Sequence, residues 1–383
     1  MGNDVNRPDI LFATIAAGGG HVATARAMAE AIENSYPGRF ELRVSDYMKD
    51  VGVTGLDRRH KDSWRRVLRY PVLARAGQRI IDSFPRPAIA AQRRILRGFA
   101  RAAAADLDRR SPRLVVSNHG LITTGLAEAK RLHGLKAPVL TFATEPHNIS
   151  AYWAESRADH VVVPSEEVRR NLLRLGVPQE KLEVVGYPVR QAFLNPPSRE
   201  RARESLGLQD RFTCLVAFGG EGVGGDQRRL VEALLNADGG PQVVAITGRN
   251  ETLRAELRKL HAGNDRLRVE GFVENVAPYL AAADVLVGKA GPASVYEALA
   301  VGRPVLLTGY AGLNERGVLR FVEREGLGVY VKNRAALLRE IERYAADLAL
   351  SEEVALRCRA LDLGYTTERL ARYVVRYALQ QGW

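Results

Sequence analysis

Apolar residues along this chain follow two alternating patterns. Short continuous apolar runs, such as DILFATIAA at residues 9–17, predict strands that are buried on both faces of a sheet. Segments such as HVATARAMAEAIENS at residues 21–35 place apolar residues at the three- and four-residue spacing of a helix. Six runs predict strands in the first half of the chain, at residues 9–17, 41–47, 112–120, 137–146, 160–165 and 181–188.

A second series of strands and helices follows a break in the pattern. Residues 188–199, PVRQAFLNPPSR, are rich in proline and predict a linker. Because βα alternation with continuous apolar strands is typical of doubly wound parallel sheets, the sequence predicts an α/β protein. We expect two Rossmann-like domains, 1–187 and 188–365, that face a ligand-binding cleft at the carboxyl ends of their strands. The later strands are expected at residues 212–220, 242–248, 267–273, 284–291 and 303–310.

Charge changes the interpretation of one segment. The formal net charge is +12, and residues 56–101 contain thirteen Lys or Arg against three Asp. Their arginines alternate with aromatic and aliphatic residues, a mixture that suits helices lying on an anionic bilayer. A solvated basic face and a nucleic-acid surface are the alternatives, although no nucleic-acid-binding motif accompanies the segment. The residues expected at the membrane are Trp64, Arg65, Arg66 and Arg69.

The location expected from the sequence is the cytoplasm, with peripheral contact to the cytoplasmic face of the membrane. The first residues lack the order of a signal peptide or a myristoylation signal, and no apolar run reaches the length of a membrane span. Cys214 and Cys358 lack metal-ligand spacing, and two thiols in a chain of 383 residues favour a reducing compartment.

Three glycine-rich turns follow predicted strands. The first, GGGH at residues 18–21, lacks the dinucleotide-binding spacing, and the chain has no Walker lysine motif. The second, AFGGEGVGG at residues 217–225, offers backbone N–H groups that a phosphate can approach closely. The third, GKAGPASVYEAL at residues 288–299, opens a helix whose N-terminus favours a diphosphate, and Glu297 lies one turn further on. A tight strand-to-helix connection is the alternative for either later turn taken singly.

Nearly the whole chain resembles the GT-B glycosyltransferases of the monogalactosyldiacylglycerol synthase and processive diacylglycerol glucosyltransferase group. The resemblance implies a GT-B fold in which residues 366–383 form a helix that packs back on the first domain. It also implies that His21 is the general base for the acceptor hydroxyl, a task that suits an imidazole. A helix-cap neighbour without chemistry is the alternative for His21. The segments that carry the resemblance are GGGHVATA (18–25), GYPVRQAF (186–193), GGEGVGG (219–225), ITGRN (246–250) and 269–310.

The resemblance further implies that the second domain binds a UDP-sugar. Phe272 would offer backbone groups to uracil, and Glu297 would hold the ribose. Asn314 and Glu315 would read the sugar hydroxyls, but the family usually has Gln at the first of these positions, which leaves the hexose open. The other residues expected to bind the donor are Gly219, Gly220, Glu221, Arg249, Lys289, Gly291, Pro292 and Ser294.

On the acceptor side, the resemblance assigns Gly19 and Gly20 to a loop that leaves room for a lipid headgroup and a sugar. The family usually has Thr-Asp with a following His and Trp, where this chain has Thr144, Glu145, His147 and Trp153. Glu145 would orient or assist His21, or contact the acceptor. His119 falls near an acceptor position of the family. A plain loop carboxylate and a capped strand end are the respective alternatives for Glu145 and His119.

These implications combine into one expected function, an inverting transfer of galactose or glucose from UDP-galactose or UDP-glucose to diacylglycerol or a glycosyldiacylglycerol. We expect anionic membrane lipids as partners, no nucleic acid, and no metal or other cofactor, because backbone dipoles can meet the charge of the leaving UDP. One alternative is a related transferase for another lipid-linked or hydrophobic acceptor, such as a peptidoglycan precursor or a carotenoid. Another is a non-catalytic nucleotide-sugar-binding protein. The basic segment disfavours a UDP-sugar epimerase of the same architecture.

Overall fold

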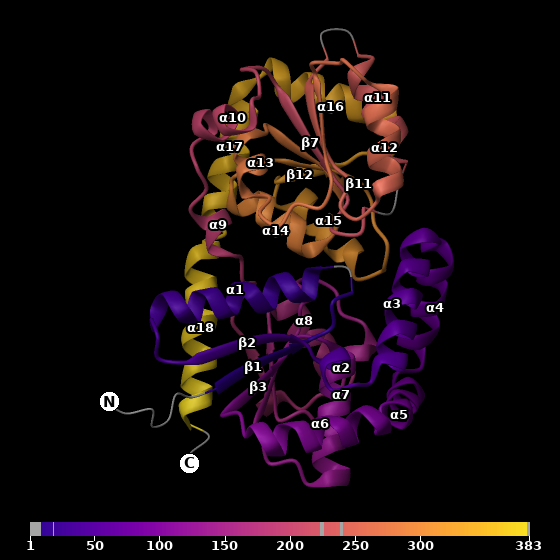
Figure 1. Ribbon diagram of the computed structural model, residues 1–383, viewed down its shortest axis with the longest axis vertical. Helices are drawn as coiled ribbons and strands as arrows, with labels where there is room; N and C mark the ends of the chain where they lie inside the picture. Colours follow the sequence, from indigo (N-terminus) through magenta and orange to yellow (C-terminus); the bar gives the residue numbers. More distant parts are fainter. Residues whose placement is uncertain (1–8, 18, 223–225, 238–239, 381–383) are drawn as a thin grey trace. The chain divides into compact units, whose positions relative to one another are not determined.

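The computed structural model describes residues 9–17, 19–222, 226–237 and 240–380, apart from the side chains at positions 9, 67–69, 71 and 74. The chain forms two compact units, each with its own parallel sheet (Figure 1). The first unit comprises Met1–Arg66, Val72–Arg190 and Leu363–Trp383, and the second comprises Val67–Pro71 and Gln191–Asp362. The division after Arg190 falls inside the segment in which the sequence predicts a linker.

The first unit is built on a six-stranded parallel sheet with the order β2-β1-β3-β4-β5-β6. Each strand lies in one of the six apolar runs from which the sequence predicts strands. In the register of the sheet, Ala13 of β1 pairs with Ser117 of β3. The loops that leave these two strands therefore start side by side at the carboxyl edge of the sheet. The strands are β1 Asp9–Thr14, β2 Glu41–Asp46, β3 Leu114–Ser117, β4 Val139–Phe142, β5 His160–Val163 and β6 Leu182–Val184.

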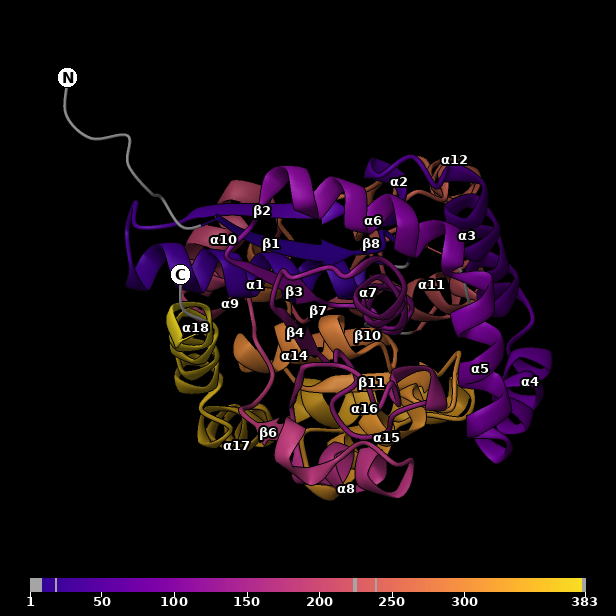
Figure 2. The same ribbon diagram turned by 90° about the horizontal axis from the view of Figure 1, so that it is seen from below.

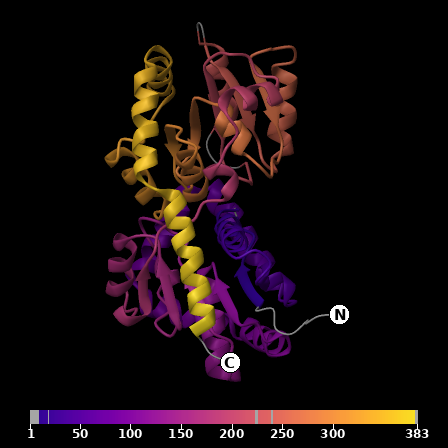
Figure 3. The ribbon, with the colours of Figure 1, turned by 90° about the vertical axis from the view of Figure 1, so that its left-hand side faces the viewer.

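Helices cover both faces of this sheet because side chains along a strand point alternately to its two sides. Ile10 and Phe12 pack with residues of α1 and α18, whereas Leu11 and Ala13 pack with residues of α2, α6 and α7. Figure 3 shows α18 lying along the first unit. The elements are α1 Gly20–Ser35, α2 Tyr47–Asp50, α6 Arg97–Arg110, α7 Gly120–His133, η1 Ala151–Trp153, α8 Glu166–Arg174, η2 Gln179–Lys181 and α18 Leu363–Gln380.

The basic segment forms three helices, α3 Thr54–Arg69, α4 Pro71–Ser83 and α5 Pro85–Ile95, which gather on one side of the first unit (Figure 2). Pro71 and Pro85 are the first residues of their helices, where a missing N–H costs nothing. Trp64 is partly buried and packs against the core cluster of the unit, and its expected contact with the membrane stays a prediction. Arg65 and Arg66 are exposed. Large exposed apolar side chains instead lie on or beside α4, at Tyr70, Val72, Leu73, Ile80 and Phe84.

Hydrogen bonds and ion pairs attach α4 and α5 to the loop that follows β4. Asp82 of α4 accepts hydrogen bonds of 2.8 Å from the hydroxyl of Ser150 and the backbone N–H of Ala151. Arg93 of α5 donates two hydrogen bonds, of 2.6 and 2.9 Å, to the fully buried carboxylate of Glu155. The same carboxylate also accepts a hydrogen bond of 3.0 Å from Nε of Arg157, so two arginines share its buried charge. These contacts hold α4 and α5 firmly on the unit.

The second unit has a six-stranded parallel sheet with the order β12-β11-β10-β7-β8-β9. Two parallel sheets covered by helices confirm the predicted α/β class. The sequence predicts five of these strands and misses β12, whose three residues are too short to show a period. The strands are β7 Thr213–Ala217, β8 Gln242–Ile246, β9 Leu267–Glu270, β10 Val285–Lys289, β11 Val305–Gly309 and β12 Gly328–Tyr330.

Nine described helices accompany this second sheet. The predicted linker contains α9 and leads into α10, which Ser198 caps by accepting a hydrogen bond from the N–H of Arg201. None of the described helices of either unit combines the length and apolar character needed to cross a bilayer. The helices are α9 Gln191–Leu194, α10 Arg199–Leu206, α11 Gln227–Leu235, α12 Glu251–Leu260, α13 Ala277–Ala282, α14 Pro292–Ala300, α15 Glu315–Arg324, α16 Arg334–Ala346 and α17 Leu348–Ala360.

One glycine decides how closely two strands of the second sheet approach. A Cβ atom on Gly288 of β10 would lie 2.3 Å from the carbonyl oxygen of Ala217, its register partner on β7. We expect Gly288→Ala to lower the free energy of unfolding by about 2 kcal/mol, because the strands must separate. Gly309→Ala on β11 is the control, since a Cβ there meets nothing within 4 Å. Denaturant unfolding measures both variants, and equal stability would contradict the expected overlap.

Candidate active site

His21 lies in the first turn of α1, where two groups from neighbouring loops reach its Nδ1 atom. The backbone carbonyl oxygen of Asn118 lies 2.9 Å from Nδ1, and the hydroxyl oxygen of Thr144 lies 2.8 Å from it. A carbonyl oxygen can only accept a hydrogen bond, so the hydrogen of the neutral ring is on Nδ1. The Nε2 atom therefore keeps a lone pair that can accept a proton.

The glycine loop explains how α1 can begin beside this ring. Gly19 is the N-cap of α1 and has φ of 84°, a left-handed conformation that favours glycine. Its carbonyl oxygen accepts the hydrogen bond from the N–H of Ala23, and no side chain caps the helix. Gly18 lies outside the described residues. Bare backbone at Gly19 and Gly20 thus turns the chain sharply from β1 into α1.

The environment of His21 keeps its imidazole neutral. Burial lowers the pKa of His21 to about 4, the hydrogen bond to the Asn118 carbonyl raises it, and repulsion by His60 lowers it. Burial dominates because a charged ring would lose its hydration without gaining a carboxylate partner. At neutral pH the ring is therefore unprotonated, and its Nε2 atom carries a lone pair.

His119 lies directly beside His21. Their ring centroids are 4.5 Å apart. His119 is the N-cap of α7, and its Nδ1 accepts a hydrogen bond of 3.2 Å from the N–H of Leu121. The hydrogen of its neutral ring is therefore on Nε2, the opposite of His21. Burial and the neighbouring histidines, His21 and His60, hold the pKa of His119 well below its usual value.

Sequence reasoning missed His60 and placed Trp153 only by resemblance. His60 of α3 packs edge to face on His119, with ring centroids 5.0 Å apart and an interplanar angle of 88°. Trp153, at the end of η1, lies 6.1 Å from the ring of His21 and 6.4 Å from that of His119. The signal for His60 was available in its spacing from Asp57 and Trp64, since all three share one face of α3. The charge of the segment concealed it.

The predicted acceptor residues after β4 lie in one loop. Thr144 is the residue whose hydroxyl reaches His21, and Glu145 follows it with a half-buried side chain. His147 is buried. The hydroxyl of Ser165 donates a hydrogen bond of 2.6 Å to the carbonyl oxygen of Pro146, which fastens the loop to the start of α8. The structure thus brings the hydroxyl of Thr144 to His21, and the expected role of Glu145 stays a prediction.

In the second unit, the turns after β7 and β8 pack backbone against backbone. Gly219 has φ of 80°, and the carbonyl oxygen of Gly220 accepts a hydrogen bond of 3.0 Å from the N–H of Arg249. A Cβ atom on Gly248 would lie 2.5 Å from the carbonyl oxygen of Gly220, so this position has no space for a side chain. Residues 223–225 of the predicted motif lie outside the described residues. Close backbone packing is thus enough by itself to require glycine at position 248.

Side chains from these turns form a charged and aromatic group. The Arg249 guanidinium lies 4.4 Å above the ring of Phe272 and 3.1 Å from the carboxylate of Glu221. Phe272 is 53% exposed. A cation stacked on an exposed aromatic ring provides a flat surface and a positive charge in one place. Three residues predicted to bind the donor are therefore neighbours.

The third glycine turn lies at the start of α14. Gly291 is its N-cap without a side-chain hydrogen bond, and Pro292 is its first residue. The backbone N–H groups of Ala293 and Ser294 have no partner within the helix, as expected for a first turn. Glu297 lies one turn along α14 and is half-buried. This helix start has the geometry that attracts an anion.

Lys289 connects the two glycine turns of the second unit. A Cβ atom on Gly219 would lie 3.9 Å from its Cε, and one on Gly291 would lie 3.4 Å from its Nζ. Its amine is hydrogen-bonded to one carboxylate oxygen of Glu315, whose other oxygen accepts a bond of 2.6 Å from the N–H of Ala311. Both oxygens of Glu315 thus contact protein groups, and its expected contact with sugar hydroxyls stays a prediction. Asn314, its predicted partner, is the N-cap of α15.

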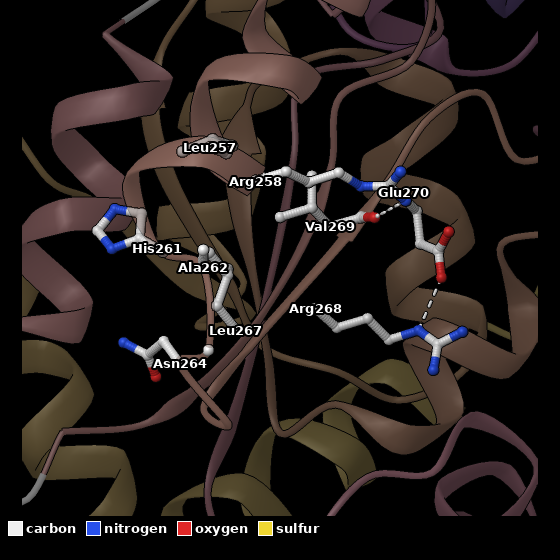
Figure 4. A pocket seen from close by; sticks show the side chains of 10 residues that line it. Leu257, Arg258, His261, Ala262, Asn264, Leu267, Arg268, Val269 and Glu270 are labelled. Carbon is white, nitrogen blue, oxygen red and sulfur yellow. Dashed lines mark hydrogen bonds and ion pairs between the residues drawn. The ribbon is translucent and has the colours of Figure 1, made fainter.

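A pocket of about 370 Å³ opens beside α12 and β9 (Figure 4). Arg258 spans it to the carbonyl oxygen of Val269 at 3.1 Å, and Arg268 pairs with Glu270 at 2.7 Å. None of the residues predicted to bind the donor lines this pocket. In the described part of the chain, no group of three or more His, Cys, Asp or Glu side chains is arranged to hold a metal ion.

Family models match both halves of the chain. The model described as Glycosyltransferase Family 4 matches residues 21–191, and the model described as Glycosyl transferases group 1 matches residues 228–347. Monogalactosyldiacylglycerol synthase 1 of Arabidopsis thaliana is 27% identical over 359 residues, 90% of this chain and 66% of that protein. The probable monogalactosyldiacylglycerol synthase 2 of Oryza sativa subsp. japonica is 27% identical over 85% of this chain and 71% of that protein. This chain spans about two thirds of the length of these relatives.

Solved structures with similar folds include enzymes of more than one activity. A glycosyltransferase from Rickettsia africae has a TM-score of 0.59 at 16% identity, covering 98% of this chain and 99% of that one. HepE from Anabaena, solved in complex with UDP, has a TM-score of 0.57 at 15% identity, covering 96% and 99%. A putative UDP-N-acetylglucosamine 2-epimerase from Listeria monocytogenes has a TM-score of 0.61 at 12% identity, covering 98% of each chain. These likenesses establish the fold.

The lowered pKa of His21 has a consequence for stability. The ring should take up a proton near pH 6.5 in the unfolded chain and near pH 4 in the folded one. Because the unfolded state binds the proton first, we expect the free energy of unfolding to fall as pH decreases through this window. Denaturant titrations at several pH values should show a shallower decline in His21→Gln than in the wild type. Histidine NMR of the folded protein gives the pKa directly, and a value near 6.5 would contradict the expectation.

Proposed function

Since the chain is a glycosyltransferase of the GT-B type, we propose that it transfers a hexose with inversion from a UDP-sugar to diacylglycerol or a glycosyldiacylglycerol at a membrane surface. The observation that carries the proposal is the neutral His21 ring, whose Nε2 lone pair is available to an acceptor hydroxyl. The diacylglycerol acceptor is supported by relatives named monogalactosyldiacylglycerol synthases. The UDP donor is supported by HepE, which was solved with UDP and with UDP-glucose.

In the proposed reaction the acceptor oxygen attacks the anomeric carbon of the hexose. His21 Nε2 takes the proton of the acceptor hydroxyl as the new carbon–oxygen bond forms. The bond between the anomeric carbon and the UDP oxygen breaks, and UDP leaves with the electron pair. A single displacement of this kind inverts the configuration of the anomeric carbon. Thr144 and the Asn118 carbonyl would hold the ring throughout the step.

Groups of the second unit would stabilise the negative charge on the leaving UDP. The first-turn N–H groups of α14 and the amine of Lys289 are placed around the two glycine turns, where they can stabilise a diphosphate. The Phe272 and Arg249 pair would receive the uracil, and Glu297 the ribose. Lys289 would then divide its hydrogen bonds between Glu315 and the donor. This arrangement requires no metal ion, and we propose that the reaction proceeds without one.

The test is a transfer assay on anionic vesicles that contain diacylglycerol, with EDTA present throughout. UDP-galactose and UDP-glucose are supplied separately, and both UDP release and glycolipid are measured. We expect glycolipid from one donor, and a rate about 10²- to 10⁴-fold lower in His21→Ala, the range expected for loss of a general base. Product in the variant at the wild-type rate would refute the role of His21. UDP release with a different lipid acceptor only would replace diacylglycerol by that acceptor.

Membrane contact is proposed for α4 and the turns at its ends. Val72, Leu73, Ile80 and Phe84 are 62–72% exposed, and the arginines of the same segment suit anionic headgroups. Exposed aliphatic side chains beside arginines favour the bilayer interface, where the aliphatic groups leave water and the arginines meet phosphates. The same proposal includes peripheral attachment of the protein to the cytoplasmic face of the membrane.

Removing this apolar surface should weaken vesicle binding. We expect the double variant Leu73→Ser and Ile80→Ser to bind anionic vesicles at least about tenfold less tightly, since each buried aliphatic side chain contributes about 1.5–3 kcal/mol. The matched control is Leu348→Ser with Leu356→Ser on α17, two side chains of similar exposure in the second unit. Co-sedimentation with vesicles measures both. Equal losses in the two double variants would sink the assignment of α4 as the membrane-facing helix.

A further inference from the structure

His60 has no place in the reaction as described above, although it is part of the same group of rings. It comes from α3, within the segment assigned to membrane contact, and its ring stands edge to face against His119. His119 in turn lies beside His21. Helix α3 carries exposed arginines on its outer side. Its inner side reaches the proposed base, His21, through the ring of His119.

The inward face of α3 is held in place independently of these rings. Asp57, His60, Lys61 and Trp64 follow one another at the three- and four-residue spacing of a single helix face. The amine of Lys61 lies 2.5 Å from the carboxylate of Asp46, at the end of β2, and 2.8 Å from that of Asp57. Trp64 packs against the core cluster one turn further on. His60 is thus fixed between two anchors, and its ring constrains the ring that it touches.

The two inner histidines are complementary in their hydrogen-bonding atoms. His21 carries its hydrogen on Nδ1, toward Asn118, and leaves Nε2 as an acceptor. His119 accepts at Nδ1 from Leu121 and leaves Nε2 as a donor. A hydroxyl that contacts both rings can give its proton to His21 while its oxygen accepts a hydrogen bond from His119. This pair of contacts orients an oxygen lone pair for attack.

We propose that His60 is a positioning residue for the transfer step, which holds the ring of His119 so that its Nε2–H meets the acceptor oxygen while His21 takes the proton. This inference rests on the proposed function. It assigns α3 two separate duties, since its outer face carries arginines and its inner face supports the acceptor site. No covalent step is added, because His60 neither gains nor loses a proton in the reaction.

A second effect of His60 is electrostatic and makes the proposal measurable. Repulsion by His60 lowers the pKa of His21. Burial lowers the pKa of His60, the Asp57 carboxylate raises it, and Lys61 lowers it. Replacing His60 by an uncharged residue should therefore raise the pKa of His21. Besides the three rings themselves, the titratable groups near them are Asp57 and Lys61 of α3 and Asp46 at the end of β2, which pairs with Lys61.

The experiment compares His60→Phe with His60→Ala in the vesicle assay over a range of pH. Phenylalanine keeps a ring against His119 but cannot be protonated, whereas alanine removes both features. We expect a several-fold lower kcat in His60→Ala, an unchanged KM for the UDP-sugar, and recovery of most of the kcat in His60→Phe. In both variants the acid limb of the pH profile should move to higher pH. His133→Phe, at the exposed end of α7, is the matched control and should match the wild type.

Two results would overturn the proposal. A kcat in His60→Ala equal to that of the wild type would show that the ring is not needed to position His119. A lowered kcat without recovery in His60→Phe, and without movement of the acid limb, would show a general loss of structure. Histidine NMR titration of the same variants needs no substrate, so it separates this proposal from the proposed function. An unchanged pKa of His21 in His60→Phe would reject the electrostatic link even if the acceptor proved to be another lipid.

Discussion

The hydrogen bond from the Nδ1–H of His21 to the carbonyl oxygen of Asn118 joins the first turn of α1 to the end of β3. It can form because β1 and β3 are neighbours in the sheet and their registers place Ala13 opposite Ser117, so that both loops leave the same edge together. A carbonyl fixes the tautomer of the ring without supplying the negative charge that a carboxylate would bring. The ring is therefore oriented but not stabilised in its charged form, and burial keeps it neutral. The rings of His119 and Trp153 lie around this one ring, and His60 packs on His119.

Under the proposed function, the second unit would have to offer positive potential to a diphosphate without placing a bare charge in a buried site. The turns after β7 and β8 are made of closely packed backbone, and only glycine fits at Gly248. The start of α14 adds aligned N–H groups at no cost in buried charge. Lys289 supplies the formal charge and is balanced by Glu315. An ion pair of this kind keeps the cation near the turns when no anion is bound.

The basic segment combines a surface role and an internal one in the same three helices. Its exposed side carries arginines and the large apolar side chains around α4, while its inner side makes ion pairs and ring contacts with the sheet edge. The two roles do not compete, since residues on opposite faces of a helix have separate neighbours. Under the proposed function, α4 would face the lipid surface while the neighbouring helix α3 places the ring of His60 against His119.

Much of this architecture could be predicted from local pattern. Eleven of the twelve strands in the described part of the chain lie in the apolar runs from which they are predicted, because a strand buried on both faces is continuously apolar. The glycine turns, His21 and the start of α14 were recognisable for a similar reason, since each depends on residue types at adjacent positions. The packing of Trp64 against the core was not predicted, because a charge pattern shows which residues are near one another but not which face of a helix is buried.

Contacts between distant segments were decided only by the folded chain. The tautomer of His21 depends on Asn118 and Thr144, which lie 97 and 123 residues away, and no local pattern relates them. The same holds for His60 against His119 and for Lys289 against Glu315. Local spacing determines whether a segment becomes a strand, a helix or a turn, because those structures are made by hydrogen bonds and steric limits between near neighbours. The identity and charge state of the groups around the His21 ring depend on which strands lie side by side, and that is a property of the sheet as a whole.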